Sequence, residues 1–548
     1  MEFISNAFYS WDGVELSFGV FSNINLFEPN KPVRYGVRAV GNKTVNRDAI
    51  VQITCEDCGY FERRPIRLEN GITEDSFLPT KNGLYCLKLI PLSLDITLEF
   101  KVAVVPRARR ANSSFSFSCQ PYIARTITNA QKIKKYDFRQ SEEAMLDIID
   151  YMGFNAARED SIYWGSMQKE PFGDVDFTKT DYLLKRLLDR GIALHWVLMG
   201  STSWAMKDKY KGETDTCYCI CPKTDMWCDY VAKFVDHYKD YSSDQIFYEI
   251  WNEPDWEFFH GTKEEFAELL EATARTVREK DSDAFVFSGG VSSPLNDTTD
   301  FRWHKKGGAT LYLKVAKRLI EEGVLNTYST HLHYAFNDLF FAFMDHGIGL
   351  AEKESGIINN GAYNTEAGVS SPDDDYQSRD NVAKALWFRS HGWGGFTQFA
   401  ITHWGEDGEE GDCFAIMRGS IPRKSVVSYT VMIDKIGQAI SHKTIADDRS
   451  IFADAYYDGK NTTVTLFNDS EAVTGTGVLY LPKDVDFRAY DLYGNPIDLP
   501  EDRAVVAQAA VVYIVCDGEI SPSAFSYKTA SERGDTIVDT EKADGRVW

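Results

Sequence analysis

The sequence predicts an α/β protein in which a (β/α)8 TIM barrel lies between an N-terminal and a C-terminal β-sandwich. Two observations lead to this fold class. Runs with period-two alternation, broken by turn residues, occupy both ends of the chain, whereas apolar β-rich runs alternate with helical patterns in the middle. The length of 548 residues is too great for one ordinary core and fits two or three domains. We place these domains at residues 1–112, 113–440 and 441–548.

The N-terminal region carries short alternating runs of the kind that form a β-sandwich. They are Val14–Val20, Val33–Ala39, Ala49–Thr54, Leu84–Ile90 and Ile96–Val105. Such a module either binds sugar or walls one side of a cleft, and we favour the wall. The arginine-rich run Arg107–Arg110 follows at the domain boundary, where we interpret it as a solvated linker rather than a binding site.

The middle region holds eight β-rich runs that alternate with helical patterns. The predicted strands are 114–119, 154–158, 192–199, 246–251, 284–288, 327–333, 362–366 and 395–404. The predicted helices are 142–152, 180–190, 226–239, 263–280, 310–322, 339–353, 379–389 and 425–440. Alternation implies parallel pairing, and eight such units in about 300 residues fit a closed barrel. A doubly wound sheet is disfavoured, because Cys119-Gln120-Pro121-Tyr122 replaces the glycine-rich loop that would follow its first strand.

Alternating runs return after residue 440 and predict the second β-sandwich. They are Ile451–Tyr457, Thr462–Asn468, Gly477–Leu481, Asp486–Tyr490 and Ala504–Val515. Residues 520–548 are polar and show no periodicity. We expect them to form an extended tail that lies on another domain.

Charge and hydropathy exclude some partners. A formal net charge of -23 repels phosphate backbones, so we expect no nucleic acid. We find no run of about 18 apolar residues, so we expect no membrane span. The first residues lack the basic and apolar regions of a signal peptide, so we expect a cytoplasmic protein, with a secreted protein trimmed of its signal as the alternative. The sequence leaves a homo-oligomer open.

The ten cysteines are spread unevenly. Cys217, Cys219, Cys221 and Cys228 lie within twelve residues, and four thiolates can bind a structural zinc ion. The alternative is a set of free or paired thiols, which the tight C-x-C-x-C spacing favours. A catalytic zinc site is a further alternative, but no His-rich ligand set accompanies the cysteines. We expect neither a catalytic metal nor an organic cofactor.

Two glutamates end predicted barrel strands, which is where catalytic residues of such barrels lie. The fourth strand runs into Trp251-Asn252-Glu253-Pro254 and the seventh into Asn364-Thr365-Glu366-Ala367-Gly368. Hydrolysis of a glycosidic bond needs two carboxyl groups, one to protonate the leaving oxygen and one to attack the sugar or activate water. Glu253 and Glu366 are therefore the candidate catalytic pair.

These two segments resemble the acid/base and nucleophile motifs of the clan A glycoside hydrolases. The chain looks most like family 39, which includes β-xylosidases and α-iduronidases, although its N-terminal sandwich departs from the usual layout of that family. The resemblance covers residues 113 to 518. It implies a retaining double displacement with Glu253 as acid/base and Glu366 as nucleophile.

Further residues match the clan position by position. Arg158 resembles the arginine that supports the nucleophile, although a salt bridge with Glu159 or Asp160 is an alternative. Asn252 matches the asparagine that binds the sugar 2-hydroxyl.

The sixth and eighth strands supply the remaining candidates. His331, His333 and Tyr334 are similar to the His-rich segment of the sixth strand. Either His333 or Tyr334 is expected to bond the nucleophile, and His331 is either a site residue or a buried core histidine. Trp404 at the eighth strand is our choice for stacking on the sugar, ahead of Trp164 and Trp196.

Retention requires carboxyl groups about 5 to 5.5 Å apart, and inversion about 6.5 to 9.5 Å. We predict the short distance and exo action on oligosaccharides such as β-xylosides, β-galactosides or β-mannosides. The alternatives are an endo-acting glycanase of the same clan and a non-catalytic carbohydrate-binding barrel.

Overall fold

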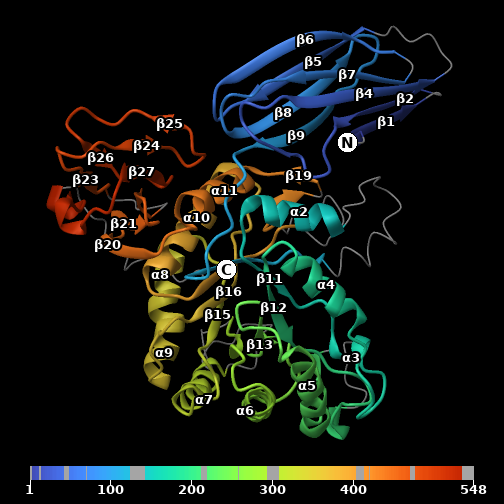
Figure 1. The fold of residues 1–548 in the computed structure, drawn as a ribbon, viewed down its shortest axis with the longest axis vertical. Helices are drawn as coiled ribbons and strands as arrows, with labels where there is room; N and C mark the ends of the chain where they lie inside the picture. The colour runs from blue at the N-terminus through green and yellow to red at the C-terminus, as the bar shows by residue number, and fades with distance from the viewer. Residues whose placement is uncertain are drawn as a thin grey trace, which may run out of the picture.

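The computed structural model describes residues 3–11, 14–41, 48–69, 71–123, 142–210, 219–256, 258–292, 308–402, 413–418, 420–469 and 475–533. Figure 1 shows three parts: a blue β-domain, a central barrel coloured from teal to orange, and an orange-to-red β-domain beside the barrel. The fold class predicted from the sequence is therefore correct.

The barrel is built from eight parallel strands in the order β14-β13-β12-β11-β10-β17-β16-β15. They are β10 (Ser116–Cys119), β11 (Ala156–Glu159), β12 (Ala193–Leu198), β13 (Ile246–Asn252), β14 (Val286–Gly290), β15 (Ser329–Leu332), β16 (Tyr363–Ala367) and β17 (Gly395–Gln398). Parallel bridges from Phe287 to Thr327 and from Val291 to Thr330 join β14 to β15 and close the ring.

Helices follow the strands and cover the outside of the barrel (Figure 1). They are α2 (Glu142–Met152), α3 (Trp164–Met167), α4 (Thr178–Leu188), α5 (Thr224–Tyr238), α6 (Lys263–Lys280), α7 (Ala309–Glu321), α8 (Asp338–Phe343), α9 (Gly349–Ser355), α10 (Asp374–Ser390) and α11 (Lys424–Ile436). A π-helical turn over Met344–Ile348 separates α8 from α9, where the sequence predicts one continuous helix. Helix α6 begins at a capping box in which Thr262 and Glu265 bond each other's backbone N–H groups.

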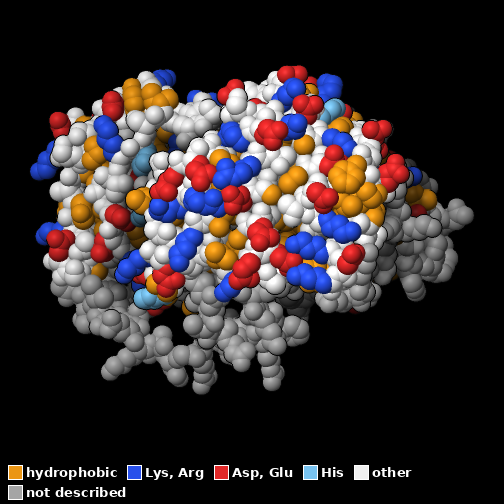
Figure 2. All heavy atoms as spheres, turned by 90° about the horizontal axis from the view of Figure 1, so that it is seen from below, with side chains coloured by type: hydrophobic (Ala, Val, Ile, Leu, Met, Phe, Trp, Pro, Cys, Tyr) orange, Lys and Arg blue, Asp and Glu red, His pale blue; other side chains and the backbone are white. Residues whose placement is uncertain are grey.

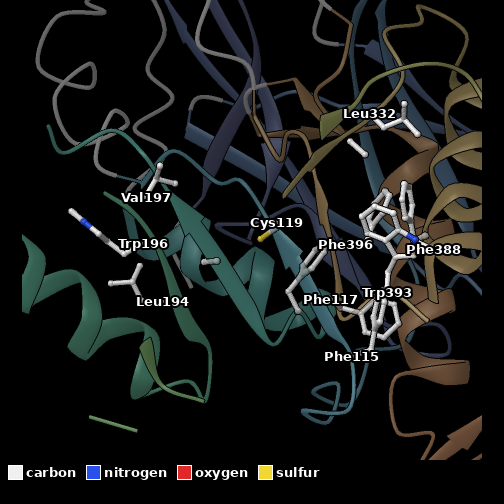
Figure 3. Packing of buried hydrophobic residues seen from close by; sticks show 14 of the residues in the cluster. Phe115, Phe117, Cys119, Leu194, Trp196, Val197, Leu332, Phe388, Trp393 and Phe396 are labelled. Carbon is white, nitrogen blue, oxygen red and sulfur yellow. The ribbon is translucent and has the colours of Figure 1, made fainter. Parts of the chain in front are cut away.

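The apolar core spreads between the barrel strands and the helices. Figure 3 shows part of it, with Phe115 and Phe117 from the start of the barrel near Phe388, Trp393 and Phe396. The rings of Phe115 and Phe117 are 4.8 Å apart, and those of Phe388 and Trp393 are 4.7 Å apart, in edge-to-face geometry. Each of these side chains is at most 5% exposed, so truncating one to alanine would destabilise the fold by about 3–5 kcal/mol.

The N-terminal domain is a sandwich of two sheets. One sheet has the order β1-β2-β4-β7 and the other β3-β9-β8-β5-β6. The strands are β1 (Ile4–Trp11), β2 (Val14–Val20), β3 (Leu26–Phe27), β4 (Val33–Gly41), β5 (Asp48–Cys55), β6 (Tyr60–Arg67), β7 (Gly71–Phe77), β8 (Gly83–Pro91) and β9 (Leu98–Val104). The sequence analysis missed β1, β6 and β7. It also missed β3, which is only two residues long. Strands β6 and β7 have few fully buried positions, which leaves a weak apolar alternation.

The C-terminal domain also contains two antiparallel sheets, with the orders β20-β21-β22-β27-β24-β25 and β26-β23-β28. The strands are β20 (Ser441–Asp448), β21 (Ile451–Tyr457), β22 (Asn461–Phe467), β23 (Val478–Tyr480), β24 (Arg488–Tyr490), β25 (Pro496–Ile497), β26 (Ala504–Val506), β27 (Val512–Asp517) and β28 (Ser526–Lys528). The expectation of a tail on another domain is wrong for β28, which pairs with β23 of its own domain. Residues 534–548 lie outside the described part of the chain.

Polar contacts join the three parts. Lys424 at the start of α11 lies 2.6 Å from Asp57 of the N-terminal sandwich. The amide of Asn495 in the C-terminal sandwich donates to the backbone carbonyl of Asn82 at 3.1 Å, and its own oxygen accepts from the Asn82 N–H. In the linker, Arg107 and Arg110 both pair with Asp150 of α2.

The face seen in Figure 2 carries interspersed acidic and basic side chains with scattered hydrophobic ones. On the barrel surface Glu271 of α6 pairs with Arg275 one turn along the same helix and with Arg318 of α7, so the second pair links the two helices. Among the described residues, no helix combines the length and the hydropathy that crossing a membrane requires.

Candidate active site

Glu253 and Glu366 face each other at the carboxyl ends of barrel strands. Glu253 directly follows β13, and Glu366 is the last residue but one of β16. One carboxylate oxygen of Glu253 lies within 4.8 Å of one carboxylate oxygen of Glu366. Glu253 is 8% and Glu366 5% exposed. This oxygen–oxygen distance agrees better with the separation of about 5–5.5 Å in a retaining pair than with the roughly 6.5–9.5 Å of an inverting pair.

Arg158 binds Glu366 from the end of β11. Its Nη1 donates to Glu366 Oε1 at 2.5 Å, and its Nε donates to Glu249 Oε2 at 2.7 Å. Burial would raise the pKa of Glu366, but His331 and Arg158 outweigh it and hold that pKa at about 2. Glu366 is therefore a carboxylate at neutral pH. The ion pairs of Arg158 with Glu249 and Glu366 favour the role at the nucleophile over the alternative salt bridge with Glu159 or Asp160. Glu159 accepts the Ile123 N–H at 2.7 Å, and Asp160 accepts from the Gln120 amide at 3.1 Å.

Asn252 is held by the same arginine. Its Oδ1 accepts from Arg158 Nη2 at 2.7 Å, and the residue is 4% exposed. Because the oxygen is engaged, the side-chain nitrogen is the group that Asn252 can offer to a ligand.

His331 lies between the two candidate carboxyl groups, which favours a role in the site over that of a buried core histidine. Its Nδ1 is 2.8 Å from Glu253 Oε1, and its Nε2 is 3.0 Å from Thr365 Oγ1. The Thr365 hydroxyl donates its own hydrogen to Glu249, so Nε2 must carry the proton in the bond with Thr365. Burial would lower the pKa of His331, but Glu366, Glu249 and Glu253 raise it to about 10. The imidazolium form donates to both oxygen partners.

The sixth strand's second histidine faces the nucleophile candidate, whereas the neighbouring tyrosine does not. His333 Nε2 lies 3.6 Å from Glu366 Oε2, and the His333 ring packs 5.1 Å from the rings of Phe399 and Phe414. The Tyr334 ring packs 4.6 Å from Phe343. The register that the sequence left open therefore favours His333.

Glu249 is a functional candidate that the sequence analysis missed. It is fully buried in β13 and accepts hydrogen bonds from the Gly290 N–H at 3.0 Å and from the Ser329 hydroxyl at 3.1 Å, in addition to Arg158 and Thr365. His195 Nε2 lies 3.1 Å from its other oxygen. Burial opposes its ionisation, but Arg158, His195 and His331 keep its pKa well below the usual range. The signal in the sequence was a glutamate within the apolar run of a central strand.

The backbone near Glu253 and Glu366 leaves room for the His331 ring and takes positive φ angles at two non-glycine residues. A Cβ on Gly290 would lie 2.1 Å from His331 Nε2, so only glycine leaves room for that ring. Trp251 and Glu253 both have positive φ, 72° and 41°. Such conformations cost of order 1 kcal/mol or more for non-glycine residues and cluster at functional sites. The buried Trp251 indole, which donates to the Phe258 carbonyl at 2.8 Å, helps to fix this turn.

The aromatic stacking candidates are not part of the described site. Trp404 lies outside the described residues. Trp164 and Trp196 are core residues, at most 1% exposed, and their rings lie 5.5 Å from Tyr230 and 5.1 Å from Phe234, respectively.

The three cysteines of the possible zinc site that the structure describes do not converge on one point. Cys217 lies outside the described residues, and Cys219, Cys221 and Cys228 do not form a three-ligand group. The burial of Cys221 raises the pKa of its thiol to about 11, so this thiol is protonated at neutral pH in the metal-free protein. Within the described part of the chain, one group has the geometry to hold a metal ion. It consists of the site residues Glu253, His331, His333 and Glu366.

Comparisons with known proteins give the fold. No protein family model matches the chain, and no curated protein matches it. A solved structure of a family 39 glycoside hydrolase from the gut symbiont Bacteroides cellulosilyticus WH2 is similar over 91% of this chain and 100% of its own, with a TM-score of 0.65 at 16% identity.

Two further solved structures match a smaller share of the chain. A glucosidase from Croceicoccus marinus covers 76% of this chain and 98% of its own, with a TM-score of 0.51 at 14% identity. A β-xylosidase of family 39 from Caulobacter crescentus covers 75% and 98%, with a TM-score of 0.50 at 16% identity.

The extent of the Bacteroides match bears on the N-terminal sandwich. The 9% of this chain outside that match amounts to about 49 residues, fewer than either sandwich contains. All three parts of the fold are therefore represented at least in part in a structure from family 39. The expectation that the N-terminal sandwich departs from the layout of that family does not hold for this relative.

Proposed function

We propose that this protein is a retaining glycoside hydrolase that cleaves β-linked glycosides by double displacement. The observation that carries the proposal is the pair of buried carboxyl groups within 4.8 Å of each other, each with a different partner. Arg158 pairs with Glu366, and His331 bonds Glu253. The similarity of the fold to family 39 structures supports it.

In the first step Glu366, which its surroundings keep ionised, attacks the anomeric carbon. Glu253 donates its proton to the glycosidic oxygen as the carbon–oxygen bond breaks, and the aglycone leaves as an alcohol. The product is a sugar ester of Glu366. In the second step Glu253, now a carboxylate, takes a proton from water while the water oxygen attacks the same carbon and displaces Glu366. Two displacements restore the β configuration.

Asymmetric bonding around the pair serves these two roles. Glu366 Oε1 is taken up by Arg158, and Oε2 lies on the side of His331 and His333. His331 bonds Oε1 of Glu253, so among the described contacts Oε2 is left as the oxygen to which we assign the transferred proton. The buried His331 imidazolium bonds Glu253 and also faces Glu366. Its positive charge is therefore already in place for the negative charge that passes between the two carboxyl groups during the reaction.

The substrate class follows from analogy. The Caulobacter structure is of a β-xylosidase. We infer that β-xylosides are the preferred substrates of this protein, followed by β-galactosides and β-mannosides. Exo action and the Asn252 contact with the 2-hydroxyl belong to the same proposal. An endo-acting glycanase would prefer long oligosaccharides over aryl monosaccharides. A non-catalytic carbohydrate-binding barrel would bind sugars without turnover.

The test is a panel of aryl β-glycosides assayed with wild type, Glu253→Gln and Glu366→Gln. We expect each variant to lose at least about 10³-fold in kcat/KM on poorly activated substrates. Glu264→Gln, the same change at an exposed position of α6, is the matched control and should retain wild-type activity.

Azide separates the two roles. Azide needs no general base, so it should restore turnover of an activated aryl substrate by Glu253→Gln and give a β-glycosyl azide. Unchanged activity in either glutamine variant would reject the assignment. Sugar binding without turnover by wild type on the whole panel would favour the binding protein.

A further inference from the structure

The four side chains that surround the reaction centre also have the arrangement of a metal site. His331 Nδ1 lies 3.7 Å and His333 Nε2 3.6 Å from Glu366 Oε2, and His331 Nδ1 lies 2.8 Å from Glu253 Oε1. One ligand atom from each of the four residues falls within 4.8 Å of all the others. Zinc bonds of about 2.0–2.1 Å in a tetrahedron place ligand atoms about 3.3–3.4 Å apart. Small side-chain adjustments would bring this set to that spacing.

The donor types select the ion. Two imidazoles and two carboxylates suit zinc and its borderline neighbours, whereas calcium and magnesium require an all-oxygen shell. The local charge also favours a dication. Zinc takes the place of the proton on His331 Nδ1 and of the proton on the Glu253 acid. Three carboxylates, those of Glu249, Glu253 and Glu366, then stand against one guanidinium. A zinc ion would balance the two remaining negative charges.

Supporting contacts already orient the ligands. His331 Nε2 donates to Thr365 Oγ1, and the Thr365 hydroxyl donates to Glu249 Oε1 at 2.7 Å. This carboxylate–hydroxyl–histidine chain leaves Nδ1 as the coordinating nitrogen, the arrangement by which outer contacts fix a metal-bound histidine. Arg158 takes Glu366 Oε1 and leaves Oε2 for the ion.

We propose that one zinc ion binds to Glu253, His331, His333 and Glu366 at the place of the scissile bond, and that it competes with substrate. Zinc is here an inhibitor and not a cofactor, because it occupies both carboxyl groups that the double displacement uses. The binding stands on the geometry alone, whereas the inhibition rests on the proposed function.

Binding is tested by calorimetric titration of zinc chloride into the metal-free full-length protein. We expect one site that calcium chloride does not fill. His333→Ala and Glu366→Gln should each weaken zinc binding at least about tenfold, because each removes one ligand. Cys228→Ser is the control, since a zinc ion held by the cysteine cluster would depend on it.

The thermal midpoint of His333→Ala shows whether this variant remains folded. His333→Gln is the second variant, and we expect the same loss of zinc affinity from it. The proposal is overturned by the absence of a zinc site in wild type, by affinity that persists in both His333 variants, or by affinity that disappears in Cys228→Ser.

Inhibition is tested on aryl glycoside hydrolysis by wild type. We expect zinc to raise KM without changing kcat, and a chelator to reverse the effect. Inhibition that lowers kcat at saturating substrate would contradict competition at this place. Zinc binding that His333→Ala abolishes in a protein without glycosidase activity would support the site and defeat the proposed function, so the two failures are distinct.

Discussion

Buried carboxyl groups behave in opposite ways at the barrel mouth and in the C-terminal sandwich. Glu249 in β13 is fully buried, and its cationic and hydrogen-bonding partners keep its pKa well below the usual range. Asp454 in β21 is 2% exposed, and burial raises its pKa to about 7, against the opposing effect of a single 2.8 Å hydrogen bond from the Thr444 hydroxyl.

The difference shows what determines charge inside this protein. Both carboxylates are removed from water, so burial alone would neutralise both. At the barrel mouth, converging partners from several strands reverse that tendency, and the same network reaches Glu366. Ionised acids therefore concentrate where the structure supplies cations, and that place is the candidate active site.

Removing the positive charge of Arg158 should have the largest effect on stability. Arg158→Gln leaves Glu249 and Glu366 buried with less compensation, and we expect a loss of about 3–5 kcal/mol in the free energy of unfolding. Urea unfolding monitored by circular dichroism measures it. Arg109→Gln, at an exposed arginine of the linker, is the control and should change stability by less than about 0.5 kcal/mol. A loss below about 1 kcal/mol for Arg158→Gln would show that the site does not depend on this charge.

Removing the negative charge of Glu249, on which these contacts converge, is expected to slow catalysis. Glu249→Gln keeps the shape but removes the charge that holds Arg158 and the Thr365–His331 chain, so we expect kcat to fall about 100-fold with KM within about threefold. The pH profile of kcat/KM should also shift, because the charge state of His331 depends on this carboxylate. A variant with an unchanged pH profile and a kcat reduced only in proportion to its folded fraction would assign Glu249 a purely structural role.

The buried carboxyl group of Asp454 should make the fold less stable as pH rises. A carboxyl group with a lowered pKa, such as that of Glu249, has the opposite effect. Asp454 has a folded pKa above its unfolded value, so the folded state binds more protons and the stabilising contribution is lost as pH rises from about 4 to 7. Between pH 5 and 7 we expect wild type to lose about 2 kcal/mol that Asp454→Asn does not lose. Denaturant titrations at both pH values measure the difference. Parallel pH dependence in the two proteins would mean that Asp454 is not protonated in the fold.

Removing one of the hydrogen-bond donors to Glu249 should have the smallest effect on stability and activity. Ser329→Ala removes one hydrogen bond to Glu249 and leaves the other donors in place, so we expect a loss of about 1 kcal/mol in stability and less than about threefold in kcat. The measurement uses the same unfolding and kinetic assays. A loss in kcat equal to that of Glu249→Gln would replace the picture of a shared network with one of a single essential donor.

The sequence predicted what depends on local patterns. Apolar periodicity located the barrel strands, and helices such as α6 have the predicted bounds. Glu253 and Glu366 were found because strand-end motifs mark them. Glu249 was missed because its role exists only after Arg158, Ser329 and Thr365 from three other strands converge on it.

Register and helix breaks also depend on tertiary packing. Choosing His333 over Tyr334 required knowing that the tyrosine ring packs on Phe343. The split of the predicted helix 339–353 arises at the π-helical turn over Met344–Ile348. Trp404 and Cys217 lie in parts of the chain that the structure does not describe, and their roles remain predictions.

The central claim is that Glu253 and Glu366 act directly on the two sides of one glycosidic bond. Proton NMR of the first sugar released from an aryl β-glycoside, recorded before mutarotation, tests this claim most directly. The account predicts that the β anomer forms first and converts slowly to the equilibrium mixture. Release of the α anomer first would mean inversion through a water molecule and would contradict the account.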